Sequence, residues 1–149
     1  MATTFDILDK AEKLELLAAE LYGAFARRFG DDAGAAKLFT RLKDEEQQHA
    51  TRVRMLAAQA RRDSRLIGKI SVDGHALDEV SGEMTVMLAN VQRGDWQADL
   101  TQTKRLLVEL EDRCSRAHAE QLLGLNDSLR KFFEQLAAQD KAHEELLRE

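Results

Sequence analysis

The chain lacks proline altogether and carries a single cysteine among its 149 residues. Without proline, no position removes a backbone donor from a helix. The many Ala, Leu, Glu, Gln, Lys and Arg residues favour long helices, because they lose little conformational freedom there. One cysteine excludes a disulfide within the chain and any metal site built from several cysteines. We expect that residue, Cys114, to be a small buried hydrophobe.

Positive charge, aromatic residues and long apolar runs are also scarce. Aromatic residues make up 5% of the chain, and the net charge is −5. That charge argues against a nucleic-acid partner, which requires clustered positive surface. No apolar run approaches the ~20 residues of a membrane span, and no basic segment followed by an apolar run marks a signal peptide. We expect a single domain over 1–149, located in the cytoplasm and bound to neither nucleic acid nor membrane.

Apolar residues recur at three- and four-residue steps along most of the chain, which predicts an all-α fold. We expect a first hairpin over about 5–62, with helices at 5–29 and 33–62. A crossover over about 63–94 contains a shorter helix at 76–92. A second hairpin over about 95–149 has helices at 95–123 and 127–147. Two antiparallel hairpins joined by a long crossover make a four-helix bundle.

One polar pattern occurs in both hairpins. Glu46-Gln47-Gln48-His49 follows Glu15 by 31 residues, and Asp140-Lys141-Ala142-His143 follows Glu109 by the same 31. The two sets are offset by 94 residues. The same offset pairs Leu16 with Leu110, Gly30 with Gly124, Phe39 with Phe133 and Leu42 with Leu136. The chain therefore reads as two related hairpins.

These repeated residues interrupt apolar stripes at matched depths, which predicts a two-metal site in the centre of the bundle. Residues three apart share a helix face, so each acid-x-x-His can direct an oxygen and a nitrogen to one point. Buried carboxylates repel one another unless cations neutralise them. Carboxylate and imidazole ligands suit iron or manganese, and zinc is possible. The predicted ligands are Glu15, Glu46, His49, Glu109, Asp112, Asp140 and His143.

The alternative is that these are ordinary polar helix residues, paired with Arg105, Arg113 or Arg116. This alternative does not explain why polar residues interrupt the apolar stripes of four helices at matching positions along the bundle. His75 lies in the crossover and His118 lies far around the third helix from Glu109, so we expect neither to be a ligand.

The first repeat, Leu14-Glu15 to Tyr22 and then Phe39 to His49, resembles the rubrerythrin branch of the ferritin-like diiron proteins. A Glu seven residues before a Tyr, followed by an acidic run that ends in Glu-x-x-His, is the family's pattern. The second repeat resembles it more weakly, and Glu109-x-x-Asp112 is similar to the family's additional acidic pair.

The resemblance implies roles for each matching residue. Glu15 and Glu109 would be terminal ligands, and Glu46 and Asp140 would bridge two iron ions. His49 and His143 complete the set, Asp112 would be the extra ligand, and Tyr22 would place a hydroxyl beside the ligands. Two positions depart from the family: Asp140 is one methylene shorter than the usual Glu, and Arg116 stands where a second Tyr is expected.

The resemblance implies a non-haem diiron oxidoreductase that reduces hydrogen peroxide or reacts with dioxygen. Because the chain has no cysteine pairs for a rubredoxin domain, electrons would come from a separate rubredoxin-like protein or a small reductant. A homodimer is expected. Two alternatives remain: iron oxidation and storage within an assembly, and a structural bundle that binds zinc.

Overall fold

The structure is a computed structural model that describes residues 2–63, 69–70, 74–121 and 127–149.

Capping residues set the points at which the first two helices begin. Helix α1 (Thr4–Arg28) begins after a capping box, in which Thr3 and Asp6 exchange side-chain to backbone hydrogen bonds. Helix α2 (Ala33–Arg62) begins after Asp32, whose side chain accepts from the backbone N–H of Ala35 at 3.0 Å. Both helices match their predicted bounds to within one residue.

The second hairpin consists of α4 (Leu100–Glu120) and α5 (Asp127–Arg148). Helix α4 begins five residues later than predicted because Asp99 and Gln102 form a capping box there. The predicted turn at Gly124 lies outside the described residues. Ala2–Thr3 (β1) and Lys69–Ile70 (β2) form a short antiparallel pair that the sequence pattern did not predict.

Helix α3 (His75–Gln92) is the predicted crossover helix, and a glycine with positive φ stands at each end. Gly74 has φ of 76° and Gly94 has φ of 78°, a backbone conformation that side chains disfavour. A Cβ at Gly74 would also come within 2.9 Å of the side chains of Ile7 and Lys10. These glycines let the chain turn sharply into and out of α3.

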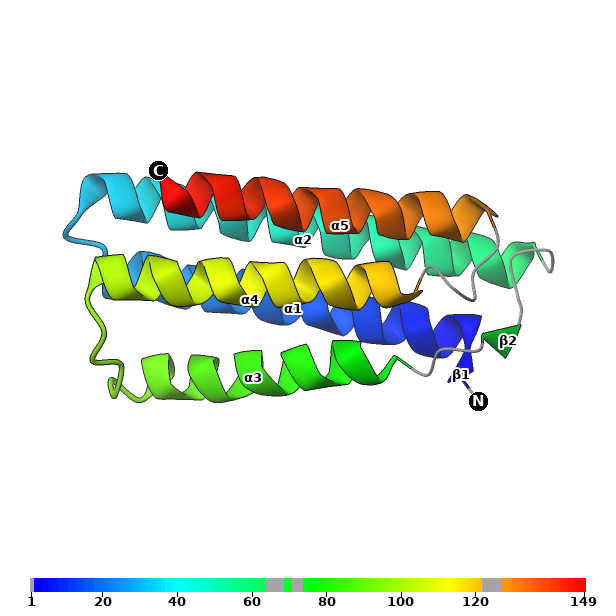
Figure 1. The fold of residues 1–149 in the computed structure, drawn as a ribbon, viewed down its shortest axis with the longest axis horizontal. Helices are drawn as coiled ribbons and strands as arrows, with labels where there is room; N and C mark the ends of the chain where they lie inside the picture. Colours follow the sequence, from blue (N-terminus) through cyan, green and yellow to red (C-terminus); the bar gives the residue numbers. More distant parts are fainter. Residues whose placement is uncertain (1, 64–68, 71–73, 122–126) are drawn as a thin grey trace.

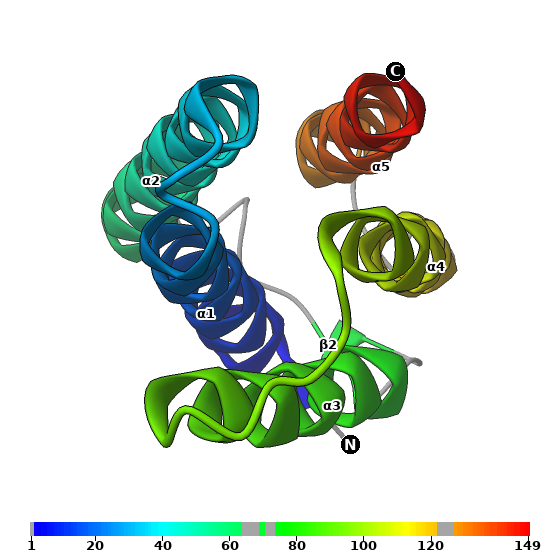
Figure 2. The same cartoon turned by 90° about the vertical axis from the view of Figure 1, so that its left-hand side faces the viewer.

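The helices form the predicted four-helix bundle with its crossover. Figure 1 shows α1 and α5 running in one direction and α2 and α4 in the other, with α3 returning the chain along the bundle. Viewed end-on, α3 lies beside α1 and α4, on the side opposite α2 and α5 (Figure 2). Because α3 spans the length of the bundle, α4 starts at the same end as α2, and the two hairpins lie side by side.

The core at one end of the bundle is aromatic. The Phe25 ring packs against Phe39 and against Trp96, with centroids 5.8 and 5.1 Å apart. Tyr22 stacks on Phe39 one turn closer to the middle. None of the described helices combines the length and the apolar character that a membrane crossing requires. The middle of the bundle, beyond Tyr22, is instead lined by buried polar side chains.

Candidate metal centre

Three side chains of the first hairpin meet between α1 and α2. Glu15 comes from α1, and Glu46 and His49 come from α2; they are 1%, 2% and 4% exposed. Nδ1 of His49 lies 3.4 Å from Oε2 of Glu15 and 3.9 Å from Oε1 of Glu46. One donor atom from each residue falls within 4.8 Å of the other two, which is close enough for a shared cation.

A second group joins the two hairpins. Nδ1 of His143, on α5, lies 2.7 Å from Oε1 of Glu46 and 3.3 Å from Oε1 of Glu111, on α4. The imidazole rings of His49 and His143 stack with centroids 5.7 Å apart. Because Glu46 belongs to both groups, its carboxylate lies between two adjacent sets of donors.

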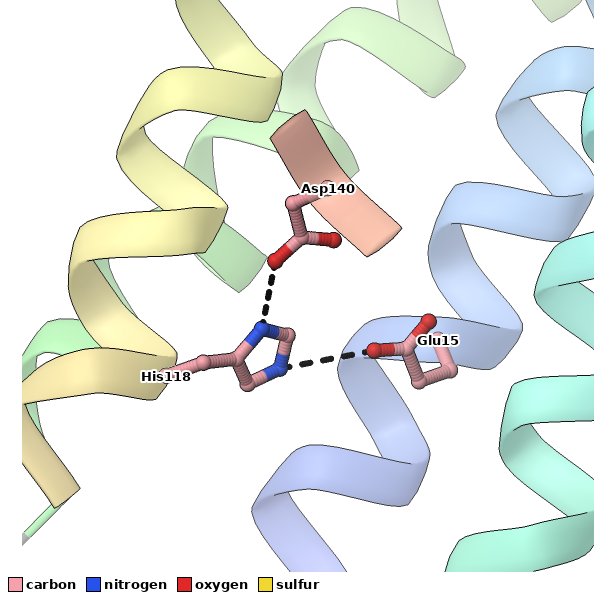
Figure 3. Close-up of side chains that lie close together, drawn as sticks. All are labelled: Glu15, His118 and Asp140. Atoms are coloured by element: carbon pink, nitrogen blue, oxygen red, sulfur yellow. Dashed lines mark hydrogen bonds and ion pairs between the residues drawn. The ribbon is translucent and has the colours of Figure 1, made fainter. Parts of the chain in front are cut away.

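A third group involves a histidine that the sequence pattern did not select. His118, on α4, is fully buried, and its Nδ1 lies 2.6 Å from Oδ2 of Asp140. Its Nε2 points toward Glu15, with Oε1 at 3.4 Å (Figure 3). His118 therefore connects α5 to α1 across the middle of the bundle.

Tyr22 and His118 occupy corresponding places in the two hairpins. Tyr22 follows Glu15 by seven residues, and its hydroxyl donates to Oε1 of Glu111 in the other hairpin. His118 follows Glu111 by seven residues and reaches Glu15 in the other hairpin. The two halves are thus related by an approximate two-fold exchange, with a phenol in one half and an imidazole in the other.

Protons offset the carboxylate charge of this site. Burial, and then the charge of Glu15, raises the pKa of Glu46 well above its usual range. Burial alone would raise the pKa of Glu15, but polar contacts with Glu46 and His49 and the charge of His118 lower it to about 2. Burial disfavours a charged His118, yet Asp140 and Glu15 raise its pKa to about 9. An ionised Glu15 therefore lies between a protonated Glu46 and an imidazolium.

Several of the converging atoms have no hydrogen bond. They are Oε2 of Glu15, Nδ1 of His49 and Nε2 of His118. Buried polar atoms without a partner cost free energy, and such atoms are usually satisfied by protein, water or an ion. Four carboxylates and three imidazoles whose donor atoms converge, and which can give up protons to an entering ion, are a suitable donor set for two divalent cations.

The structure gathers five of the seven predicted ligands in these groups: Glu15, Glu46, His49, Asp140 and His143. The predicted inward position of Glu109 is wrong, because that side chain is exposed and Glu111 takes its place. Asp112 belongs to none of the three groups. It is half-buried and pairs with Lys141 at 2.5 Å and with Arg116 at 2.6 Å.

A change of register explains the error. The offset of 94 holds between α2 and α5, where the paired Phe39 and Phe133 are both fully buried. It does not hold between α1 and α4, where Leu16 is 39% exposed but its partner Leu110 is 2% exposed. Glu15 corresponds to Glu111 instead, an offset of 96. The matching seven-residue steps to Tyr22 and His118 were the signal that could have identified this register.

Four further sequence expectations concern single residues. Cys114 is a buried free thiol, as predicted. His75 lies outside the site as expected, in an exposed ion pair with Glu79. The exclusion of His118 from the site was wrong, because rotation of α4 directs it inward. Arg116, which stands where the resemblance led us to expect a second Tyr, is exposed beside Asp112.

Comparison with known proteins agrees with this arrangement. A family model described as Rubrerythrin matches residues 6–149. No curated protein matches the chain, and no solved structure matches it either. The family match covers both hairpins and the crossover, and therefore every residue of the three groups. The chain belongs to the rubrerythrin family.

Proposed function

We propose that this protein is a diiron oxidoreductase that reduces hydrogen peroxide or reacts with dioxygen. The observation that carries the proposal is the pair of adjacent donor groups that share Glu46. Glu15 and His49 would hold one ion, and Glu111 and His143 would hold the other. Two ferrous ions would supply the two electrons that such a reduction needs.

Burial of the site limits its substrates to small molecules. The donor residues are at most 4% exposed, so a bulky organic substrate has no direct access. Peroxide, dioxygen and a metal ion are small enough to reach a buried polar site. The Tyr22 hydroxyl stays neutral because burial, and then the charge of Glu111, raises its pKa well above the usual value. It therefore remains a hydrogen-bond donor that orients the Glu111 carboxylate.

The chain itself holds no cysteine pairs for a rubredoxin-like electron donor. We therefore propose a separate reductant, either a small rubredoxin-like protein or a diffusible molecule. A homodimer and a cytoplasmic location complete the proposal. Manganese could replace iron in the same donor set.

Metal binding is the first test. Protein purified without chelators and then stripped should take up two equivalents of Fe²⁺ under anaerobic titration. Glu111→Gln should weaken uptake of one equivalent, because its carboxylate lies in the second group. Glu109→Gln is the matched control and should bind like the wild type, because that side chain is exposed. Equal losses in the two variants would contradict the site described above.

Reactivity is the second test. Stopped-flow mixing of the ferrous protein should show oxidation by peroxide that is faster than oxidation by dioxygen. Equal rates would rule out the peroxidase function and leave a dioxygen-reacting or iron-oxidising protein. Uptake of many iron ions per chain, within a large shell seen by light scattering, would favour iron storage.

A zinc-binding structural bundle is the second candidate. The His118–Asp140 contact favours it, because carboxylates commonly orient the imidazoles that ligate zinc. Zinc as the only metal in freshly purified protein, together with no oxidation of the iron-loaded form by either oxidant, would establish this function instead.

A further inference from the structure

We propose that His118 is a third imidazole ligand of the metal centre and that Asp140 positions His118 instead of bridging the two ions. This inference rests on the proposed metal-binding function. It changes the role that the resemblance implies for Asp140, and it adds a ligand at a position where the other hairpin carries a tyrosine.

The surroundings of Asp140 support the first part. Asp140 and His143 are three residues apart on α5, but they fall in different groups. The donor atom of His143 lies with Glu46 and Glu111, whereas Asp140 lies with His118 and Glu15. The short Asp140 side chain is 3% exposed, and its Oδ2 is engaged by Nδ1 of His118 at 2.6 Å. Because Oδ2 is already engaged by His118, this oxygen is poorly placed to bind two metal ions at once.

The free nitrogen of His118 supports the second part. The ring is fully buried, and Nε2 has no hydrogen bond. Figure 3 shows the ring held between Asp140 on one side and Glu15 on the other. Once an ion has displaced the proton on Nε2, a histidine that donates Nδ1–H to a carboxylate presents the Nε2 lone pair, and metal-binding histidines are commonly oriented in this way.

Glu15 lies between two imidazoles at equal distances. Its Oε2 is 3.4 Å from Nδ1 of His49, and its Oε1 is 3.4 Å from Nε2 of His118. Both nitrogens, and Oε2 of Glu15, have no hydrogen bond. An ion bound by Glu15 thus has two imidazole donors nearby, whereas the ion beside Glu111 has His143 and a carboxylate that Tyr22 orients. The two ions would be inequivalent.

Nuclear magnetic resonance of the zinc-loaded wild-type protein tests the proposal without any reaction. The chain has four histidines, and His75 is an exposed internal control with a side chain 73% exposed. In protein labelled with ¹⁵N-histidine, zinc should shift the ring nitrogens of His49, His118 and His143 but not those of His75. His118 should coordinate through Nε2 and keep its proton on Nδ1. Shifts confined to His49 and His143 would overturn this inference alone. Zinc that shifts none of the three would overturn the metal site as well.

Two variants test whether His118 or Asp140 contributes more to zinc affinity. His118→Ala should weaken zinc binding more than Asp140→Asn, measured by competition with a chromophoric chelator. The asparagine oxygen can still accept from Nδ1, so Asp140→Asn should cost about 10–100-fold in affinity, as is usual for an orienting partner. It should also keep the zinc-induced shift of His118. If Asp140→Asn instead weakened zinc binding more than His118→Ala did, Asp140 would be the ligand. This conclusion requires that zinc still shifts His49 and His143 in His118→Ala as it does in the wild type.

Discussion

Removing one hydroxyl from the centre of the bundle tests whether Tyr22 is a structural partner of the acidic site. Tyr22→Phe keeps the ring, which is 2% exposed and stacks on Phe39 with centroids 6.3 Å apart. The substitution therefore leaves the core packing in place. It deletes only the hydrogen bond from the hydroxyl to Oε1 of Glu111.

The expected cost follows from the charge of the acceptor. A hydrogen bond to a charged group contributes about 1.5–3 kcal/mol net. Nδ1 of His143 lies 3.3 Å from the same oxygen, so Glu111 keeps one polar neighbour and the lower end applies. We expect metal-free Tyr22→Phe to lose about 1.5 kcal/mol of unfolding free energy, which lowers Tm by roughly 3–6 °C in a chain of this size.

Urea unfolding with a chelator present, followed by circular dichroism, measures this difference. Thr51→Val is the matched control, because it also removes one hydroxyl. That hydroxyl is exposed and bonds only to a carbonyl of its own helix, so the change should stay within about 0.5 kcal/mol. A Tyr22→Phe protein as stable as the wild type would contradict this expectation, because the hydroxyl would then contribute nothing to the metal-free fold.

Three other changes have expected outcomes. Leu42→Ala should cost about 2–5 kcal/mol in urea unfolding because the side chain is fully buried, whereas Met55→Ala, 67% exposed, should change stability by less than about 0.5 kcal/mol. Asp112→Asn should cost at most about 1 kcal/mol and leave zinc affinity unchanged, since its ion-pair partners Arg116 and Lys141 are exposed; a loss of metal would restore the role first predicted for it. Metal binding should release protons and strengthen as pH rises toward 9, because an ion must displace the proton of Glu46, whose pKa is raised, and that of His118, whose pKa is about 9. Calorimetry in buffers of different ionisation enthalpy measures that release, and a pH-independent affinity would contradict it.

Local chemistry was sufficient to predict the helices of the first hairpin. Asp32 is a strong N-cap, and the stripe through Phe39, Leu42 and Val53 has one unambiguous inward face, so the bounds of α2 agree with the structure. The polar members of that stripe, Glu46 and His49, were found for the same reason. Their neighbours on adjacent faces, Gln47 and Gln48, are exposed.

Helix α4 was less predictable because leucines and acids lie on more than one of its faces. Leu106 and Leu107 suggest two alternative stripes, yet only Leu107 is buried. Glu109 and Glu111 are two residues apart, which places them about 200° apart around a helix. A small change in register therefore exchanges an exposed carboxylate for a buried one, and spacing within α4 does not reveal which is correct.

Three properties could be read from the amino-acid sequence alone: the chain forms helices, two hairpins carry acid-x-x-His, and these acids require cations or protons. Capping, periodicity and charge are local properties, and they are visible without a partner helix. The inward face of α4 could be known only from the folded bundle, because it depends on how α4 packs against α3 and α5. Packing thereby selected Glu111 over Glu109 and brought His118 between Asp140 and Glu15.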